Sequence, residues 1–234
     1  MKAVILAGGL GVRLKPFTEI IPKPLLPIGE KSVLEIQITR LKKYGFEEVY
    51  LATNYKSDYI KNFLGDGSRY GVKLKISKEE KPLGTAGPLS LLKEDLMEPF
   101  IVMNGDILTT IDFLKFYEFG ISMNANLTVA IKKLIMPFAF GNIFYEGNYV
   151  TGIEEKPDIE REILAGIYLM KPAIFDLIPY NKFLDMDKLI KTMLNQNIPV
   201  AKYHLREYWL DIGQISDYEK AQDDYKLHFN EEVR

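Results

Sequence analysis

The sequence predicts an α/β protein built around a doubly wound, mostly parallel sheet. In the first half of the chain, short apolar runs typical of buried strands alternate with segments that have helical periodicity. The first run, Ala3–Leu6, leads directly into a glycine-rich turn. Because open sheets of this kind bind ligands at the carboxyl ends of their strands, this turn marks a candidate site.

The predicted elements of the first half follow one another in regular alternation. After the first strand, Val33–Tyr44 places apolar residues on one broad face, which predicts a helix. The later elements are a strand at Val49–Ala52, a helix at Asp58–Leu64 closed by Gly65, a strand at Val72–Ile76, a helix beginning over Gly84–Lys93 and a strand at Pro99–Met103.

The second half is richer in strands, and Glu146-Gly147-Asn148 predicts a hairpin turn within it. Its predicted elements are strands at Asn126–Lys132, Gly141–Tyr145, Tyr149–Glu155, Leu164–Leu169 and Val200–Tyr203, and helices near Pro172–Leu177, near Asp187–Leu194 and from Ile215. We find no linker, so we expect residues 1–234 to form one domain with two halves, 1–110 and 111–234.

Composition excludes several classes of protein. The chain has 234 residues, of which 47% are apolar and 26% charged, as in an ordinary globular domain. A net charge of −2 argues against general nucleic-acid binding, and the lack of cysteine excludes disulfides and thiolate metal sites. Because no apolar run suits a membrane span or a signal peptide, a cytoplasmic location without membrane contact is expected.

Positive charge flanks the turn that follows the first strand. The turn Gly8-Gly9-Leu10-Gly11 offers backbone N–H groups, and Arg13 and Lys23 add two cations, which together predict a triphosphate site. A dinucleotide-binding loop would need glycine where Leu14 stands and an acidic residue where Asn54 follows the second strand. A Walker A sequence is also missing, so NAD binding and a P-loop are both disfavoured.

This motif resembles the opening of the sugar-phosphate nucleotidyltransferases, G-G-x-G-x-R-L-x-P-x-T followed by P-K-P-L. The matching residues run from Gly8 to Thr18 and from Pro22 to Leu25. The resemblance extends to about Tyr225, and it implies a Rossmann-like fold with a nucleotide half and a smaller sugar-binding β/α half. It also implies that an NTP and a sugar 1-phosphate react to give an NDP-sugar and pyrophosphate.

The resemblance also implies roles for individual residues around the nucleotide. The stretch from Glu80 to Gly87 resembles the family's P-L-G-T-A-G loop, which recognises the base. Arg13 is expected to bind the pyrophosphate leaving group, and Lys23 to neutralise the α-phosphate. The implied nucleotide-binding residues are Leu6, Ala7, Gly8, Gly9, Gly11, Arg13, Glu80, Pro82, Gly84 and Thr85.

Two aspartates are candidate magnesium ligands. Asp106 follows a predicted strand in Asn104-Gly105-Asp106, although such a sequence also suits a turn or a helix N-cap. Mg²⁺ in phosphate chemistry usually takes one or two carboxylates together with phosphate oxygens. Asp211 lies in Trp209-Leu210-Asp211-Ile212-Gly213, which resembles the family's W-x-D-x-G segment and its second metal ligand. We therefore expect Asp106, a catalytic residue with Arg13 and Lys23, to share Mg²⁺ with Asp211.

The chain matches the family's sugar-binding motifs less completely than its nucleotide-binding motifs. Glu155-Lys156-Pro157 resembles the family's E-K-P motif, which implies that Glu155 contacts sugar hydroxyls and Lys156 holds the sugar phosphate. The other implied sugar-side residues are Asn104, Gly141 and Gly166. Where many members have Asn-Ala-Gly, this chain has Leu164-Ala165-Gly166, so the sugar stays undetermined.

Three readings of the function stay open. The best match is a guanylyltransferase of a hexosamine, mannose or heptose 1-phosphate, which would use GTP and serve nucleotide-sugar supply, as for cell-surface polysaccharides. Uridylyl or thymidylyl transfer is the alternative within the same chemistry. A catalytically silent sugar-nucleotide-binding regulatory subunit is the alternative of another class. A homodimer through an exposed strand or through the segment 138–140 is also a possibility.

Overall fold

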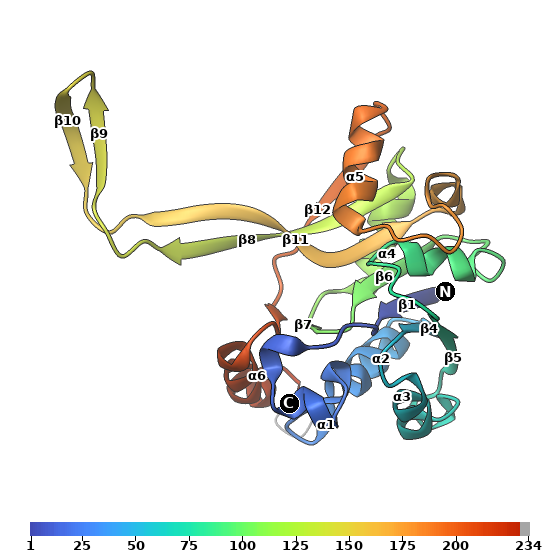
Figure 1. Cartoon of the computed structure of the whole chain (residues 1–234). Coiled ribbons are helices and arrows are strands. Elements are labelled where there is room, and N and C mark those ends of the chain that lie inside the picture. Colours follow the sequence, from blue (N-terminus) through green and yellow to red (C-terminus); the bar gives the residue numbers. More distant parts are fainter. Residues whose placement is uncertain (230–234) are drawn as a thin grey trace.

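A seven-stranded sheet forms the centre of the protein in the computed structural model, which describes residues 1–229 (Figure 1). Strands β1, β4, β5 and β6 run parallel, β12 runs parallel to β8, and β11 is antiparallel to both β6 and β8. In spatial order they are β12 (Val200–His204), β8 (Leu127–Pro137), β11 (Asp158–Met170), β6 (Phe100–Asn104), β1 (Lys2–Leu6), β4 (Glu48–Thr53) and β5 (Lys73–Lys78). The predicted doubly wound, mostly parallel sheet is confirmed.

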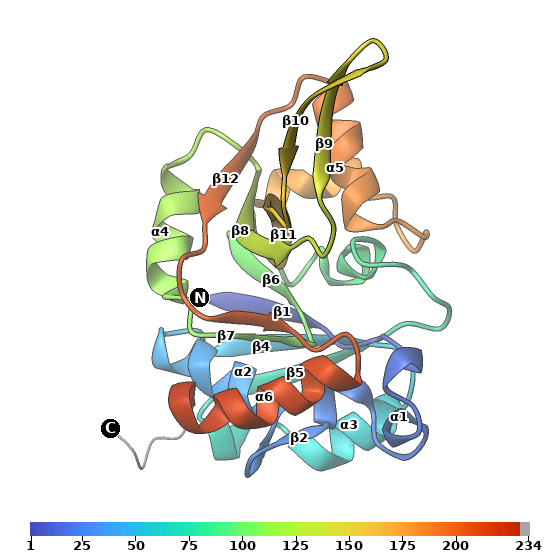
Figure 2. The ribbon, with the colours of Figure 1, turned by 90° about the vertical axis from the view of Figure 1, so that its left-hand side faces the viewer.

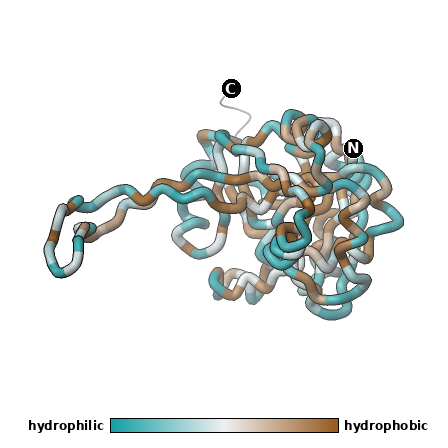
Figure 3. Tube along the Cα trace, turned by 90° about the horizontal axis from the view of Figure 1, so that it is seen from above, coloured by the Kyte–Doolittle hydropathy of each residue, from teal (hydrophilic) through white to brown (hydrophobic). Residues whose placement is uncertain are grey.

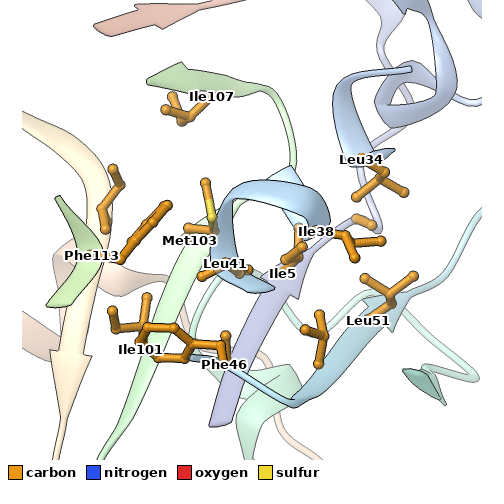
Figure 4. Close-up of a cluster of buried hydrophobic side chains, with 14 of the residues drawn as sticks. Ile5, Leu34, Ile38, Leu41, Phe46, Leu51, Ile101, Met103, Ile107 and Phe113 are labelled. Carbon is orange, nitrogen blue, oxygen red and sulfur yellow. The ribbon is translucent and has the colours of Figure 1, made fainter. Parts of the chain in front are cut away.

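The central strands bury side chains on both faces, which is why they read as continuous apolar runs. In β1, Ala3 and Ile5 join one core cluster while Val4 joins the cluster on the opposite face. Figure 4 shows part of the first cluster, where Leu34 and Ile38 of a helix meet strand side chains. The helices on this face are α2 (Val33–Lys43), α3 (Ser57–Leu64) and α4 (Phe113–Ser122), and α5 (Met186–Asn195) covers the other.

The C-terminal segment returns to the first half of the chain. Strand β13 (Trp209–Asp211) pairs with β7 (Ile107–Thr109), and α6 (Ile215–His228) packs beside α2 (Figure 2). The predicted halves 1–110 and 111–234 thus share one sheet and one core. Their division into nucleotide and sugar roles stays a prediction.

Two predicted helices are 3₁₀ segments instead, at Gly87–Leu92 and Pro172–Leu177. Each is six residues long and has proline at its first or second position, as is common where a short helical turn begins. Further short elements are α1 (Phe17–Ile20), β2 (Pro27–Ile28), β3 (Lys31–Ser32) and the 3₁₀ segments Val12–Leu14, Lys23–Leu25 and Ser68–Tyr70. Among residues 1–229, the structure has no helix with the length and apolar character that crossing a membrane requires.

Strands β8 and β11 run well beyond their predicted ends and form a long ribbon. Residues 132–137 of β8 pair only with residues 158–163 of β11, and the hairpin β9 (Asn142–Glu146) and β10 (Tyr149–Glu154) stands at its end. We call residues 132–163 the arm; Figures 1 and 3 show it projecting away from the sheet. Solvent surrounds the ribbon, so its sequence lacks the apolar alternation by which a half-buried strand is recognised.

Candidate active site

Two joined compartments lie at the carboxyl ends of β1 and β6. The smaller has a volume of about 170 Å³ and the larger about 400 Å³, and Leu6, Gly9 and Asp106 line both. The smaller compartment is also lined by Gly11, Val12, Arg13, Lys23, Pro24, Gly105 and Gly213. The larger is also lined by Gly8, Leu10, Ala52, Asn54, Glu79, Pro82, Leu83, Gly84, Thr85, Pro88, Asn104 and Phe183.

Gly11 shapes the turn that forms one wall of the smaller compartment. Its φ is +63°, and a Cβ there would lie 2.7 Å from Thr18 Cγ2 and 3.0 Å from Lys23 Cβ. The Thr18 hydroxyl donates to the Gly11 carbonyl at 2.8 Å. Only glycine combines this backbone conformation with so close an approach, and the result brings Lys23 against the turn.

The loop after β6 places Asp106 opposite Lys23. The Lys23 ammonium contacts Asp106 Oδ2 at 2.5 Å, and both side chains are largely buried. Gly105 donates its N–H to the Leu6 carbonyl at 2.9 Å, which holds the loop against the end of β1. From α2, the buried Gln37 Nε2 donates to two carbonyls of the loop, at 3.0 Å to Asn104 and 2.8 Å to Ile107.

Asp211 reaches the same place from the far end of the chain. It lies opposite Ile107 in the β13–β7 pair, and the Ile212 N–H donates to the Asp106 carbonyl at 3.0 Å. Burial raises the pKa of Asp211, and the nearby negative charge of Asp106 raises it further, while Lys23 and Arg13 act in the opposite direction. A Cβ on Gly213 would lie 3.5 Å from the Arg13 guanidinium, so Arg13 borders this group.

The two aspartates fit a divalent cation that prefers oxygen ligands. Asp106 Oδ1 and Asp211 Oδ1 are buried, and neither has a hydrogen-bond partner among residues 1–229. Unpaired buried carboxylate oxygens are costly, so a cation there would remove a penalty that the fold carries. Within the same residues, no cluster of three or more acidic or histidine side chains forms a full protein cage. The pair suits Mg²⁺, which draws its other ligands from phosphate and water.

The acidic residue in the larger compartment is Glu79, whereas the sequence pointed to its neighbour. Glu79 Oε2 accepts from the Leu83 N–H at 3.0 Å, and Oε1 would lie 3.2 Å from a Cβ on Gly8. Burial raises the pKa of Glu79. Glu80 is exposed and lines neither compartment.

The other predicted nucleotide residues lie together. Ala7 is buried beneath the turn, where its N–H donates to the Ala52 carbonyl at 2.7 Å. The remaining ones line the two compartments: Leu6, Gly8, Gly9, Gly11, Arg13, Pro82, Gly84 and Thr85. Sequence reasoning missed Asn54 and Phe183, which enter the larger compartment from loops and carry no motif.

The predicted sugar-side residues fall into two separate groups. Gly166 lies beside Asn104 at the edge of the compartments, since a Cβ there would meet Asn104 Nδ2 at 2.7 Å. The other three, Gly141, Glu155 and Lys156, lie on the arm, and no residue of 132–163 lines either compartment.

Trp209 connects the second aspartate to the sugar side. Its indole N–H donates to the Ala165 carbonyl at 2.8 Å, so β13 is tied to β11 one residue before Gly166. The side chain is only partly buried and thus does more than fill the core. The aspartate pair and the turn at Gly166 are therefore held in fixed relation.

Comparison with known proteins agrees with this geometry. A family model described as "Nucleotidyl transferase" matches residues 2–227. The chain belongs to the nucleotidyl transferase family. Its members' motifs account for the glycine turn and for both aspartates, which the structure brings together from opposite ends of the chain.

One named relative shows how far the similarity to this chain extends. A probable mannose-1-phosphate guanylyltransferase of Oryza sativa subsp. japonica is 37% identical over 227 residues, which cover 93% of this chain and 63% of the relative. This chain therefore spans less than two thirds of that relative's length.

Two solved structures are similar to this chain over nearly its whole length. HddC from Yersinia pseudotuberculosis complexed with GMP-PN has 29% identity and a TM-score of 0.74, covering 96% of this chain and 99% of that one. A putative glucose-1-phosphate thymidylyltransferase from Bacillus anthracis has 25% identity and a TM-score of 0.78, covering 95% and 94%.

Proposed function

We propose that the chain transfers a guanylyl group from GTP to a sugar 1-phosphate, giving a GDP-sugar and pyrophosphate. A sugar-phosphate oxygen forms a bond to the α-phosphorus, and the bond from that phosphorus to the α,β-bridging oxygen breaks. The observation that carries the proposal is that Arg13, Lys23 and Asp106 line one compartment beside the glycine turn, and that Asp211 lies close enough to feel the charges of all three. The reaction needs no protein nucleophile, only positioning and neutralisation of charge.

Each charged group has a part in this reaction. Arg13 lies at the outer side of the glycine turn and would bind the departing pyrophosphate. Lys23 lies inside, against Asp106, and would neutralise charge that develops on the α-phosphate. Asp106 and Asp211 would hold Mg²⁺, which when bound draws electron density from the phosphate oxygens.

Glu79 supports guanine as the base. Guanine presents two adjacent donors, N1–H and the N2 amino group, and a carboxylate accepts both. The donor of uracil or thymine is flanked by two carbonyl oxygens, which a carboxylate repels. Glu79 is buried in the larger compartment with Oε1 turned toward Gly8, and Oε2 is held by the Leu83 N–H.

The named relatives also support guanine as the base. The relative from Oryza sativa is named a mannose-1-phosphate guanylyltransferase, and the structure of HddC contains GMP-PN. We therefore propose mannose 1-phosphate, or a hexosamine or heptose 1-phosphate, as the second substrate, and a cytoplasmic role in nucleotide-sugar supply. The neighbour named a thymidylyltransferase keeps dTTP as the alternative.

The test is pyrophosphate release with Mg²⁺, measured for five NTPs against a panel of sugar 1-phosphates. We expect release with GTP and one sugar 1-phosphate of the mannose, hexosamine or heptose type. Release with dTTP or UTP alone would overturn the choice of base and leave the reaction class standing. Binding of GDP-sugars without any release would instead support a silent regulatory subunit.

A further inference from the structure

The two compartments lack a cation for the second phosphate of the proposed reaction. Their only positively charged lining residues are Arg13 and Lys23. Lys23 is engaged by Asp106, and both cations lie beside the glycine turn, where the triphosphate would bind. A sugar 1-phosphate adds further negative charge next to the α-phosphate, and besides Mg²⁺ a third cationic side chain at the edge marked by Asn104 and Gly166 would offset that charge.

The arm carries two charged residues, Glu155 and Lys156, that line neither compartment of their own chain. A Cβ on Gly141 would lie 3.1 Å from Glu155 Oε2, so the two strand ends of the hairpin meet there. Lys156 follows at once, with a φ of +48° that non-glycine residues seldom adopt. Such conformations persist where the surroundings impose them, and they are concentrated at binding sites. Glu155 and Lys156 are both exposed to solvent on the arm.

Within residues 1–229 of a single chain, the arm packs against no core. No residue of 132–163 is buried, and a two-stranded ribbon has little stability alone in water. Large apolar side chains lie exposed along it: Ile135, Met136, Phe138, Phe140, Ile143, Phe144, Tyr145, Tyr149, Val150 and Ile153. At about 100 Å² each they amount to an area on the order of 1,000 Å², the scale of one side of a specific dimer interface.

The arm projects away from the sheet (Figures 1 and 3), and none of its residues lines the compartments of its own chain. The pairing from Leu164↔Ile131 to Asp158↔Pro137 continues without a bulge, so the ribbon extends the sheet instead of folding back over it. Six paired residues span about 20 Å, and the hairpin adds a similar length. An arm of this length can cross an interface between two molecules.

We propose that two copies of this chain exchange arms, so that Glu155 and Lys156 of each copy complete the compartments of the other. Around a two-fold axis, the arm of each copy occupies the compartments of the other. Both arms and both sets of compartments are then used, so the assembly stops at a dimer. The exchange buries the apolar side chains of the arm and brings the missing cation to the edge at Asn104 and Gly166. The role given to Lys156 rests on the proposed function, whereas the exchange itself does not.

A crosslinking experiment tests the exchange without reference to activity. The chain has no cysteine, so Asn104→Cys with Lys156→Cys introduces the only thiols. With a short bis-maleimide, we expect a covalent dimer on a denaturing gel and a dimer mass in solution. Crosslinking within single chains, or a monomer at micromolar concentration, would overturn the proposal. The single variants are the controls.

Complementation tests whether the exchanged arm serves the reaction. Lys156→Ala and Asp106→Asn, each expected to be inactive, are co-expressed with different tags and purified through both. Exchange leaves one compartment with an intact Asp106 and a Lys156 from the other copy, so about half of the wild-type activity returns. The matched control pairs Asp106→Asn with Asp211→Asn, which leaves no intact compartment.

The outcomes of the two experiments are separable. No return of activity in the doubly tagged protein, with an active wild type, shows that each arm serves its own chain and overturns the proposal. Full activity of Lys156→Ala would also overturn it. An inactive wild type that still crosslinks between chains would refute the proposed function and leave the exchange of arms standing.

Discussion

At the scale of the residue, the proposed preference for guanine depends on Glu79. Glu79→Gln keeps the size of the side chain and its contact with the Leu83 N–H, but it replaces a charged acceptor with an amide. We expect the preference for GTP over UTP, as a ratio of kcat/KM, to fall by about 10- to 100-fold, because one charged hydrogen-bonding contact is lost. Steady-state kinetics with both nucleotides measure this.

The matched control is Glu80→Gln, at the exposed neighbouring position. It should leave both rates unchanged. An unchanged preference in Glu79→Gln, or an equal change in both variants, would mean that guanine is read by other groups.

The partly buried carboxylate of Asp211 lowers the stability of the folded protein, at a position that the proposed reaction uses. Its pKa is raised in the folded protein above the ordinary value of 3.8, so the folded state binds this proton more tightly than the unfolded state. Stability therefore falls as pH rises from the ordinary value through the raised pKa of the folded state. Without metal at pH 7, Asp211→Asn should be more stable by about 1 kcal/mol, or about 2–4 °C in Tm.

The measurement for Asp211→Asn is thermal unfolding in EDTA at several pH values, with activity assayed in Mg²⁺. The stabilisation should disappear at pH values below 3.8, where both states are protonated. Activity should fall by several orders of magnitude. A lower Tm at pH 7 would show that Asp211 is not held against the charge of Asp106.

At this scale the sequence predicted about half of the residues that line the compartments, among them every charged one except Glu79. Arg13, Lys23 and both aspartates belong to motifs whose spacing is visible in the chain. Glu79 and Glu80 are adjacent and chemically identical, so only the path of the backbone after β5 decides which one turns inward.

At the scale of the element, α2 holds the loop that carries Asp106. Gln37 donates to the partly buried carbonyl of Asn104 and the buried carbonyl of Ile107, on either side of that loop, so Gln37→Met removes both hydrogen bonds at nearly constant volume. We expect a cost of about 1–3 kcal/mol in stability. A fall in kcat of about 10- to 100-fold should accompany it, because the loop no longer holds Asp106 in place.

Denaturant unfolding and kcat at saturating substrate test this together. Gln196→Met, at an exposed position, is the control and should change neither quantity. If Gln37→Met loses stability but keeps its kcat, Gln37 supports the core and does not position Asp106.

The elements themselves were predictable where burial leaves a pattern. The central strands are apolar on both faces and α2 has a broad apolar face, so both were found from sequence. The arm was underestimated because charged residues such as Lys133 and Glu160 pair across a solvated ribbon. The short β7 and β13 depend on each other, from opposite ends of the chain, and give no local signal.

At the scale of the whole molecule, the reaction site is gathered from distant parts of one sheet and its crossovers. The glycine turn follows β1, Asp106 follows β6, and Asp211 arrives with the last strand of the chain. Sequence motifs gave the members of this group, and the parallel pairing of β1 and β6 explains why the glycine turn and Asp106 meet, whereas Asp211 is brought there by the antiparallel pair of β13 and β7. The position of the arm outside the compartments could not be predicted from the sequence. The motif at Glu155 and Lys156 gives the residue types, but it does not show whether they act in their own chain or in another copy.

The most direct measurement follows the α-phosphate of GTP through the reaction. Wild type and Asp106→Asn are each incubated with Mg²⁺, mannose 1-phosphate and GTP labelled at the α-phosphate, and the products are separated. With mannose 1-phosphate, or with a hexosamine or heptose 1-phosphate in its place, we predict a labelled GDP-sugar and unlabelled pyrophosphate in equal amounts from the wild type, and a rate at least 100-fold lower in Asp106→Asn, which has lost a charged ligand. Label that stays in GTP with every sugar 1-phosphate of the mannose, hexosamine and heptose types would contradict guanylyl transfer by this chain.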